Sequence, residues 1–172
     1  MRLIALLVCL FGAVACGSPG PTGTPLATVS NFENDVMSFE YPANWNVMVP
    51  ESGDAALVLL STEVVATTEP RLATIGPDGV YIAWTEKAAG PVVAPDPSAS
   101  TEVEVGGRPA VVVQTTADGD CESIGGDQLL TVTVDLASPS QDVRMQACTR
   151  GPNFELTSAT IAGMLASVEW KS

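Results

Sequence analysis

The sequence predicts an α+β domain, in which an antiparallel β-sheet of about seven or eight strands carries a C-terminal helix packed on one face. Two observations predict this class. Apolar and polar residues alternate with a period of two along most of the chain, and the same stretches are rich in β-branched residues. Near the C-terminus the period changes, because apolar residues recur at helical intervals between Ile161 and Val168.

Short strands are expected in the first half of the domain. They are residues 28–32, 37–41, 45–49, 57–61 and 80–85. Residues 57–61 form a continuous apolar run, which is typical of a strand covered on both faces. Residues 62–77 are predicted to form a loop, and three prolines exclude regular structure from residues 90–100.

The strand signals are clearer in the second half. Residues 101–105 and 108–116 flank Gly106-Gly107, which favours a hairpin with a two-residue turn. Residues 130–136 and 143–147 continue the sheet, with their apolar side chains on one side. A final helix is expected to begin near Thr157 or Ser158, which are the candidate N-caps.

The N-terminus is typical of an export signal. Met1-Arg2 precedes an almost wholly apolar run over residues 3–14, which as a helix spans about 18 Å and falls short of a bilayer core of roughly 30 Å. Residues 1–15 are therefore predicted to be a lipoprotein signal peptide. The segment Ala13-Val14-Ala15-Cys16 resembles a lipobox, so we expect cleavage before Cys16 and acylation of its thiol, with palmitate among the chains. Plain secretion by signal peptidase I is the alternative.

A tether and a single domain follow the signal. Residues 17–25 consist only of Gly, Ser, Pro and Thr and cannot bury a core, so residues 16–26 are predicted to be the lipidated Cys and its tether. Residues 27–172 then form one domain. Lipid chains hold such a domain on a membrane. We expect it at the cell membrane, facing the extracytoplasmic side.

Composition excludes several functional classes. A net charge of −13 argues against nucleic acid as a partner. The absence of His removes Ser-His and Cys-His catalysis and His-ligated zinc. The chain also lacks the glycine-rich sequences that cradle nucleotide phosphates. We therefore expect no cofactor and no catalytic residues, with an unrecognised hydrolase as the alternative.

Two of the four cysteines are expected to pair in the mature domain. Cys9 leaves with the signal and Cys16 takes lipid, whereas Cys121 and Cys148 remain in an oxidising setting. The predicted strand directions bring these two to the same end of the sheet, so a disulfide is favoured. A free or redox-active pair and metal ligation are the alternatives.

Acidic residues crowd the connection before residue 130. They are Asp118, Asp120, Glu122 and Asp127. Alternate carboxylates in such a loop suit Ca²⁺, which collects oxygen ligands. However, Ser123 and Leu129 occupy the positions where an EF-hand loop needs Gly and Glu. A solvated acidic loop is favoured, with weak Ca²⁺ binding as the alternative.

Four aromatic residues are candidates for a ligand groove. They are Tyr41, Trp45, Tyr81 and Trp84, whose side chains combine an apolar body with a polar tip. The chain has only nine aromatic residues, so packing in the core is the favoured role and a groove is the alternative.

The segment Ser38-Phe-Glu-Tyr-Pro-Ala-Asn-Trp45 resembles the F-x-Y-P-x-x-W opening of PsbP-like domains, a group that includes the extrinsic photosystem II protein and LpqN-type bacterial lipoproteins. Further matches follow in the same order at residues 59–61, 102–110 and 161–168. Together they run from about residue 30 to 170. Family members often carry a helix in the middle, where this chain has Pro91, Pro95 and Pro97.

The resemblance implies an α/β sandwich with no common catalytic set, used chiefly for protein contacts and assembly. With the lipobox, it leads us to expect a non-catalytic, lipid-anchored domain that binds or helps assemble an envelope protein. A carrier lipoprotein for a small ligand or Ca²⁺ is the alternative.

Overall fold

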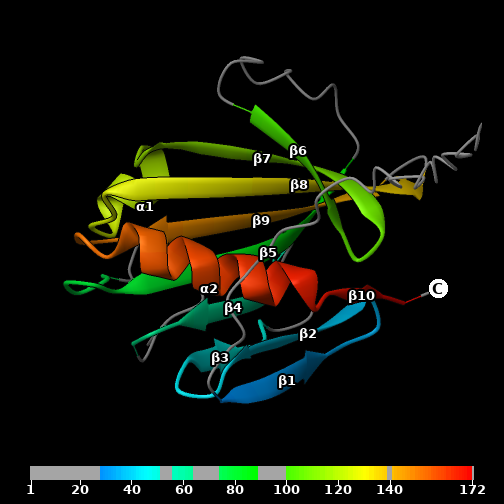
Figure 1. The fold of residues 1–172 in the computed structure, drawn as a ribbon, viewed down its shortest axis with the longest axis horizontal. Coiled ribbons are helices and arrows are strands. Elements are labelled where there is room, and N and C mark those ends of the chain that lie inside the picture. Colours follow the sequence, from blue (N-terminus) through cyan, green and yellow to red (C-terminus); the bar gives the residue numbers. More distant parts are fainter. Residues whose placement is uncertain (1–27, 51–55, 64–73, 89–99, 139–140, 172) are drawn as a thin grey trace, which may run out of the picture.

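Two antiparallel sheets and a long helix enclose the main core of the domain (Figure 1). A computed structural model describes residues 28–50, 56–63, 74–88, 100–138 and 141–171. The predicted signal peptide, Cys16, the tether and the proline-rich stretch 91–97 lie outside the described residues. Within the described part of the chain, no helix is long and apolar enough to cross a bilayer.

The described residues form ten strands and two helices. A small sheet has the order β1-β2-β10, from β1 (Val29–Glu33), β2 (Met37–Pro42) and β10 (Glu169–Trp170). A large sheet has the order β3-β4-β5-β9-β8-β7-β6, from β3 (Asn46–Met48), β4 (Ala56–Ser61), β5 (Val80–Ala88), β6 (Ser100–Val105), β7 (Arg108–Thr116), β8 (Gln128–Ser138) and β9 (Gln141–Thr149). The helices are α1 (Gly119–Ser123) and α2 (Phe154–Ala166).

The predicted α+β class with a C-terminal helix is confirmed, and the strands divide between two sheets. The large sheet has seven strands, while β1 and β2 form the second sheet with β10, which the sequence did not predict. The predicted N-caps are wrong, because α2 begins at Phe154 with Asn153 as its N-cap residue. The side chain of Asn153 bonds to Asp78 Oδ1 at 3.0 Å instead of capping the helix.

The turn between β6 and β7 needs both of its glycines. Gly106 and Gly107 have φ angles of +57° and +72°, the left-handed conformation that a tight two-residue hairpin turn requires. Gly106 also lies under the C-terminal segment, where an added Cβ would approach the carbonyl oxygen of Val168 and Nε1 of Trp170 to 2.7 Å. The predicted hairpin is therefore confirmed.

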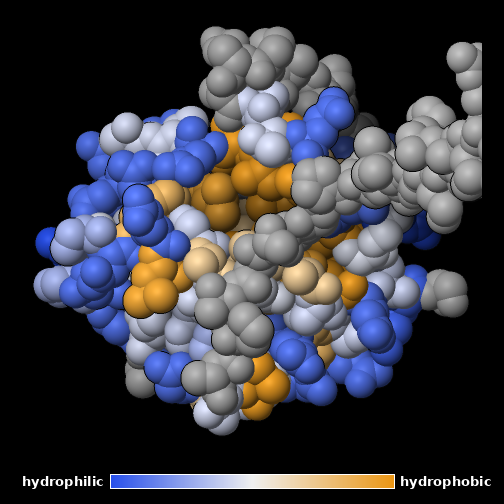
Figure 2. Space-filling model, viewed as in Figure 1, coloured by the Kyte–Doolittle hydropathy of each residue, from blue (hydrophilic) through white to orange (hydrophobic). Residues whose placement is uncertain are grey.

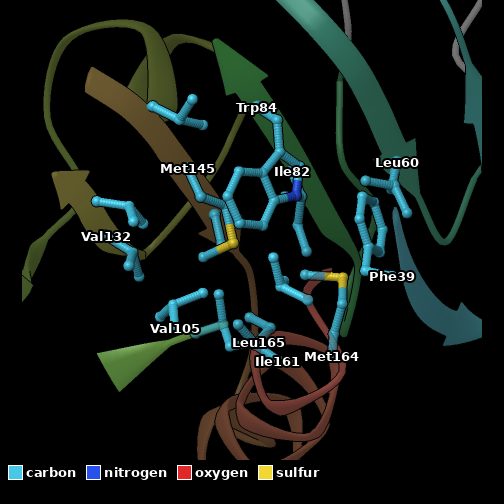
Figure 3. Packing of buried hydrophobic residues seen from close by; sticks show 14 of the residues in the cluster. Phe39, Leu60, Ile82, Trp84, Val105, Val132, Met145, Ile161, Met164 and Leu165 are labelled. Atoms are coloured by element: carbon cyan, nitrogen blue, oxygen red, sulfur yellow. The ribbon is translucent and has the colours of Figure 1, made fainter. Parts of the chain in front are cut away.

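The main core lies between one face of the large sheet, here called the core face, and a layer made of α2 and the small sheet. Trp84 at its centre is fully buried and stacks on Phe39 with ring centroids 5.8 Å apart. In Figure 3, Ile161 and Leu165 of α2 point toward Val105 and Val132 of the large sheet. The apolar residues that recur at helical spacing in the sequence thus lie on the side of α2 that faces this sheet.

A smaller cluster packs on the opposite face of the large sheet, here called the second face. Its buried members are Leu59, Ile75, Tyr81, Cys121, Ile124 and Cys148. Adjacent residues of β4 serve different clusters, since Leu60 lies in the main core and Leu59 in the smaller one. This confirms that β4 is covered on both faces, as its continuous apolar run predicts.

Candidate functional site

A depression of about 140 Å³ lies on the second face, where α1 meets the strands. Its described lining consists of Tyr81, Ala83, Asp118, Asp120, Cys121, Ile124, Leu129, Gln146 and Cys148. Strand pairing explains how three strands share one floor, because Tyr81 on β5 pairs with Cys148 on β9, which pairs with Leu129 on β8. One row further along, Ala83 pairs with Gln146.

The connection between β7 and β8 forms the remaining wall and is held at several points. The sulfurs of Cys121 and Cys148 lie at disulfide-bonding distance, with their Cα atoms 5.5 Å apart. This bears out the predicted pairing. The amide of Ile75 donates to the carbonyl oxygen of Ile124 at 2.9 Å, and the amide of Asp127 donates to the carbonyl oxygen of Thr149 at 2.8 Å. The wall is thus tied to β9 at Cys121 and Asp127, and to the segment before β5 at Ile124.

Tyr81 is the most unusual residue of this lining. Only 2% of its surface is exposed, yet its hydroxyl has no hydrogen-bond partner within the described part of the chain. Buried polar groups are nearly always paired, so an unpaired hydroxyl in a pocket wall calls for an explanation. Loss of hydration on burial raises the pKa of Tyr81 to about 12, which keeps the hydroxyl protonated at neutral pH.

The four acidic residues of the 118–127 loop do not converge. Asp118 and Asp120 line the depression, whereas Asp127 accepts a hydrogen bond from the amide of Gly151 at 2.9 Å. Glu122 lies two residues beyond Asp120 on α1, which turns it about 200° around the helix axis. Among the described residues, no three His, Cys, Asp or Glu side chains lie close enough to hold a metal ion. The four carboxylates therefore do not form the oxygen cage that the calcium alternative requires.

The four aromatic candidates do not form a groove either. Tyr41 and Trp45 pack half-buried against the main core, and Trp84 is buried inside it. Tyr81 lies on the second face instead, because residues three apart on a strand point to opposite faces. The sequence spacing between Tyr81 and Trp84 already carried this information. The lining residue Gln146, which sequence reasoning missed, has the same strand parity as Cys148.

A larger hollow of about 450 Å³ lies beside the small sheet. Its charged lining consists of Glu33, Glu40, Glu169 and Lys171. Two contacts pair polar groups here: Lys171 Nζ lies 2.8 Å from Glu33 Oε1, and the Ser167 hydroxyl accepts a hydrogen bond from the backbone amide of Glu40 at 2.8 Å. The hydrogen bond and charge of Lys171 lower the pKa of Glu33. This hollow offers no comparable unpaired buried group among its described residues.

Part of the core face is not covered by α2. Figure 2 shows apolar surface above the helix, over β7 and β8 beside β6. Val103 on β6 and Val112 on β7 have the parity of the core face but remain only half-buried. An apolar surface at the open end of a sheet is a feature of contact sites.

No family model and no curated protein matches the sequence. Solved structures that resemble this chain include the following two. One is a crystal structure from Bacteroides thetaiotaomicron with 12% identity and a TM-score of 0.44 over 79% of this chain, and this chain spans 45% of its length. The other is the solution structure of cyanobacterial PsbP (CyanoP) from Synechocystis sp. PCC 6803, with 9% identity and a TM-score of 0.50 over 92% of this chain and 98% of that one. The chain therefore has a PsbP-like α+β fold.

Proposed function

We propose that this protein is a non-catalytic, lipid-anchored domain on the extracytoplasmic side of the cell membrane, where it binds or helps assemble an envelope protein. It is best grouped with the LpqN-type lipoproteins, on the sequence matches that begin at residues 38–45. The lipobox and the Gly/Pro tether support the anchoring. The absence of His supports the lack of Ser-His and Cys-His catalysis.

The observation that carries protein binding is the uncovered part of the core face. Val103 and Val112 continue the rows of side chains that form the main core, yet neither is fully buried. A partner placed beside α2 extends the same apolar core by about 25 cal/mol for each Å² of apolar surface that it covers. β6 is also the last strand of the large sheet, so a partner can contact both the face and the edge.

Neighbouring valines on β7 provide a matched test. Val112 lies on the core face and Val111 on the second face, and both are half-buried. A photo-crosslinking amino acid is placed at either position of the tagged, lipidated protein, and the cells are irradiated. We expect position 112 to capture one stoichiometric envelope protein from the membrane fraction and position 111 to capture none. Equal capture from both positions, or none from either, rejects this docking face.

Anchoring is tested separately. Replacing Cys16 with Ala removes the only acceptor for the lipid in the proposed scheme, so we expect the protein to leave the membrane fraction. Unchanged membrane fractionation of Cys16→Ala defeats the anchoring part of the proposal and leaves the docking face unaffected.

A further inference from the structure

The depression on the second face combines an unpaired hydroxyl with unpaired charges. The Tyr81 hydroxyl is buried and lacks a hydrogen-bond partner among the described residues. Asp118 and Asp120 also line the depression, and neither forms an ion pair with any described residue. The lining therefore holds three polar side chains that have no partner among the described residues.

The charge of the lining selects a cation. Two carboxylates and the amide of Gln146 accompany the tyrosine, and no lysine or arginine stands among the described residues of the lining. The net charge of −13 attracts cations toward the protein as a whole.

Shape and wall chemistry favour an organic cation over a metal ion. A water molecule occupies about 30 Å³ of liquid, so about 140 Å³ accommodates a ligand of roughly four to six non-hydrogen atoms. Ala83, Ile124 and Leu129 supply apolar walls. Such walls suit methylene groups, whereas a hard metal ion needs six or more oxygen ligands.

We propose that this depression binds a primary ammonium group at the end of a short aliphatic chain. The Tyr81 oxygen and the Gln146 side-chain oxygen accept N–H hydrogen bonds, and the carboxylates of Asp118 and Asp120 balance the charge. The ring of Tyr81 adds a cation–π contact. The methylene chain lies against Leu129 and Ala83.

This site is independent of the proposed docking face. Tyr81 and Gln146 point to the second face of the large sheet, whereas Val103 and Val112 lie on the core face. Loss of one activity by mutation is therefore expected to leave the other intact.

Calorimetric titration of the purified mature protein with butylammonium chloride tests the proposal. We expect saturable binding of butylammonium, and none of n-butanol or CaCl₂ at the same concentration. Tyr81→Phe is expected to weaken binding about tenfold, because it removes one hydrogen bond to a charged group. The same variant is expected to keep its melting temperature, since the hydroxyl has no partner to lose in the free protein. A structural role alone does not give this combination.

Matched charge variants complete the experiment. Asp118→Asn/Asp120→Asn is expected to abolish binding, whereas Asp35→Asn/Glu155→Gln, which removes two exposed charges elsewhere, is expected to keep it. N-acetyl-lysine amide distinguishes two sources of the ammonium group: its binding assigns the site to a lysine side chain of a protein, and exclusive binding of butylammonium assigns it to a free amine. Absence of saturable butylammonium binding, or equal loss in both double variants, overturns the proposal.

Discussion

The indole Nε1 of Trp170 donates a hydrogen bond to the carbonyl oxygen of Val105 at 2.9 Å. This bond joins β10 of the small sheet to the hairpin at the edge of the large sheet. The same indole lies edge-on to Trp84, with ring centroids 6.4 Å apart. The C-terminal strand thus links the two sheets through a single side chain.

Trp170→Phe keeps an aromatic ring at this position but removes the donor. We expect the free energy of unfolding to fall by about 1 kcal/mol for the lost hydrogen bond, with a further loss for the smaller ring. Urea denaturation measures the change. Trp45→Phe is the control, because the Trp45 indole is also half-buried but donates no hydrogen bond to the described residues. An equal loss in the two variants contradicts a special role for the bond.

Alanine substitutions at Gly106 and Gly107 distinguish the cost of backbone strain from the cost of a steric clash. Both have positive φ, so alanine at either position costs about 1 kcal/mol of backbone strain. An added Cβ meets nothing within 4 Å at Gly107 but collides with Trp170 and Val168 at Gly106. We expect Gly106→Ala to be the more destabilising by about 1–3 kcal/mol, as thermal or urea unfolding measures. Equal effects rule out close packing under the C-terminal segment.

Strand alternation made much of the large sheet predictable. The bounds of β7 were predicted to the residue, because the glycine turn before it and its run of β-branched residues leave little freedom. The partner of each strand was not predictable, since period two tells which face a side chain occupies but not which strand lies beside it. β2 pairs with β10, at the far end of the chain.

The start of α2 was missed for a physical reason. Its first turn contributes little to the core, since Leu156 is 70% exposed, so the helical period of apolar residues begins only near Ile161. In the candidate site, the disulfide followed from strand directions. The unpaired state of the Tyr81 hydroxyl could not be predicted from the sequence, because the hydrogen-bond partners available to it depend on neighbours from three separate strands and a loop.

Removal of the disulfide is expected to destabilise the domain. Cys121 and Cys148 are separated by 27 positions, and closing a loop of that length stabilises by about 3.5 kcal/mol in the chain-entropy model. We therefore expect Cys121→Ala/Cys148→Ala to unfold at a clearly lower urea concentration than the oxidised protein. Reduction of the wild type serves as a second route to the same state. Identical midpoints before and after reduction contradict a structural disulfide.

Alkaline pH is expected to destabilise the protein through Tyr81. An unfolded tyrosine ionises near pH 10, whereas Tyr81 keeps its proton up to a pKa of about 12 in the folded state. Between these pH values the folded state binds more protons, so the free energy of unfolding falls as pH rises. We expect Tyr81→Phe to lose less stability than wild type over this window.

The control for this comparison is Tyr41→Phe, which leaves Tyr81 as the only tyrosine of the chain. Its phenolate absorbance then reports the ionisation of Tyr81 directly. A midpoint near pH 10 in the folded protein contradicts the desolvated setting of the hydroxyl.

The pairing of β2 with β10 also dictates when the domain can finish folding. During synthesis the chain emerges from its N-terminus, so the second edge of β2 is covered only after β10 has been made. Met37 pairs with Trp170 across that edge, and Phe39 packs in a core that α2 completes. A nascent chain lacking only its last turn of helix and β10 therefore keeps these side chains accessible. The topology therefore delays closure of the small sheet until the C-terminal strand has been made.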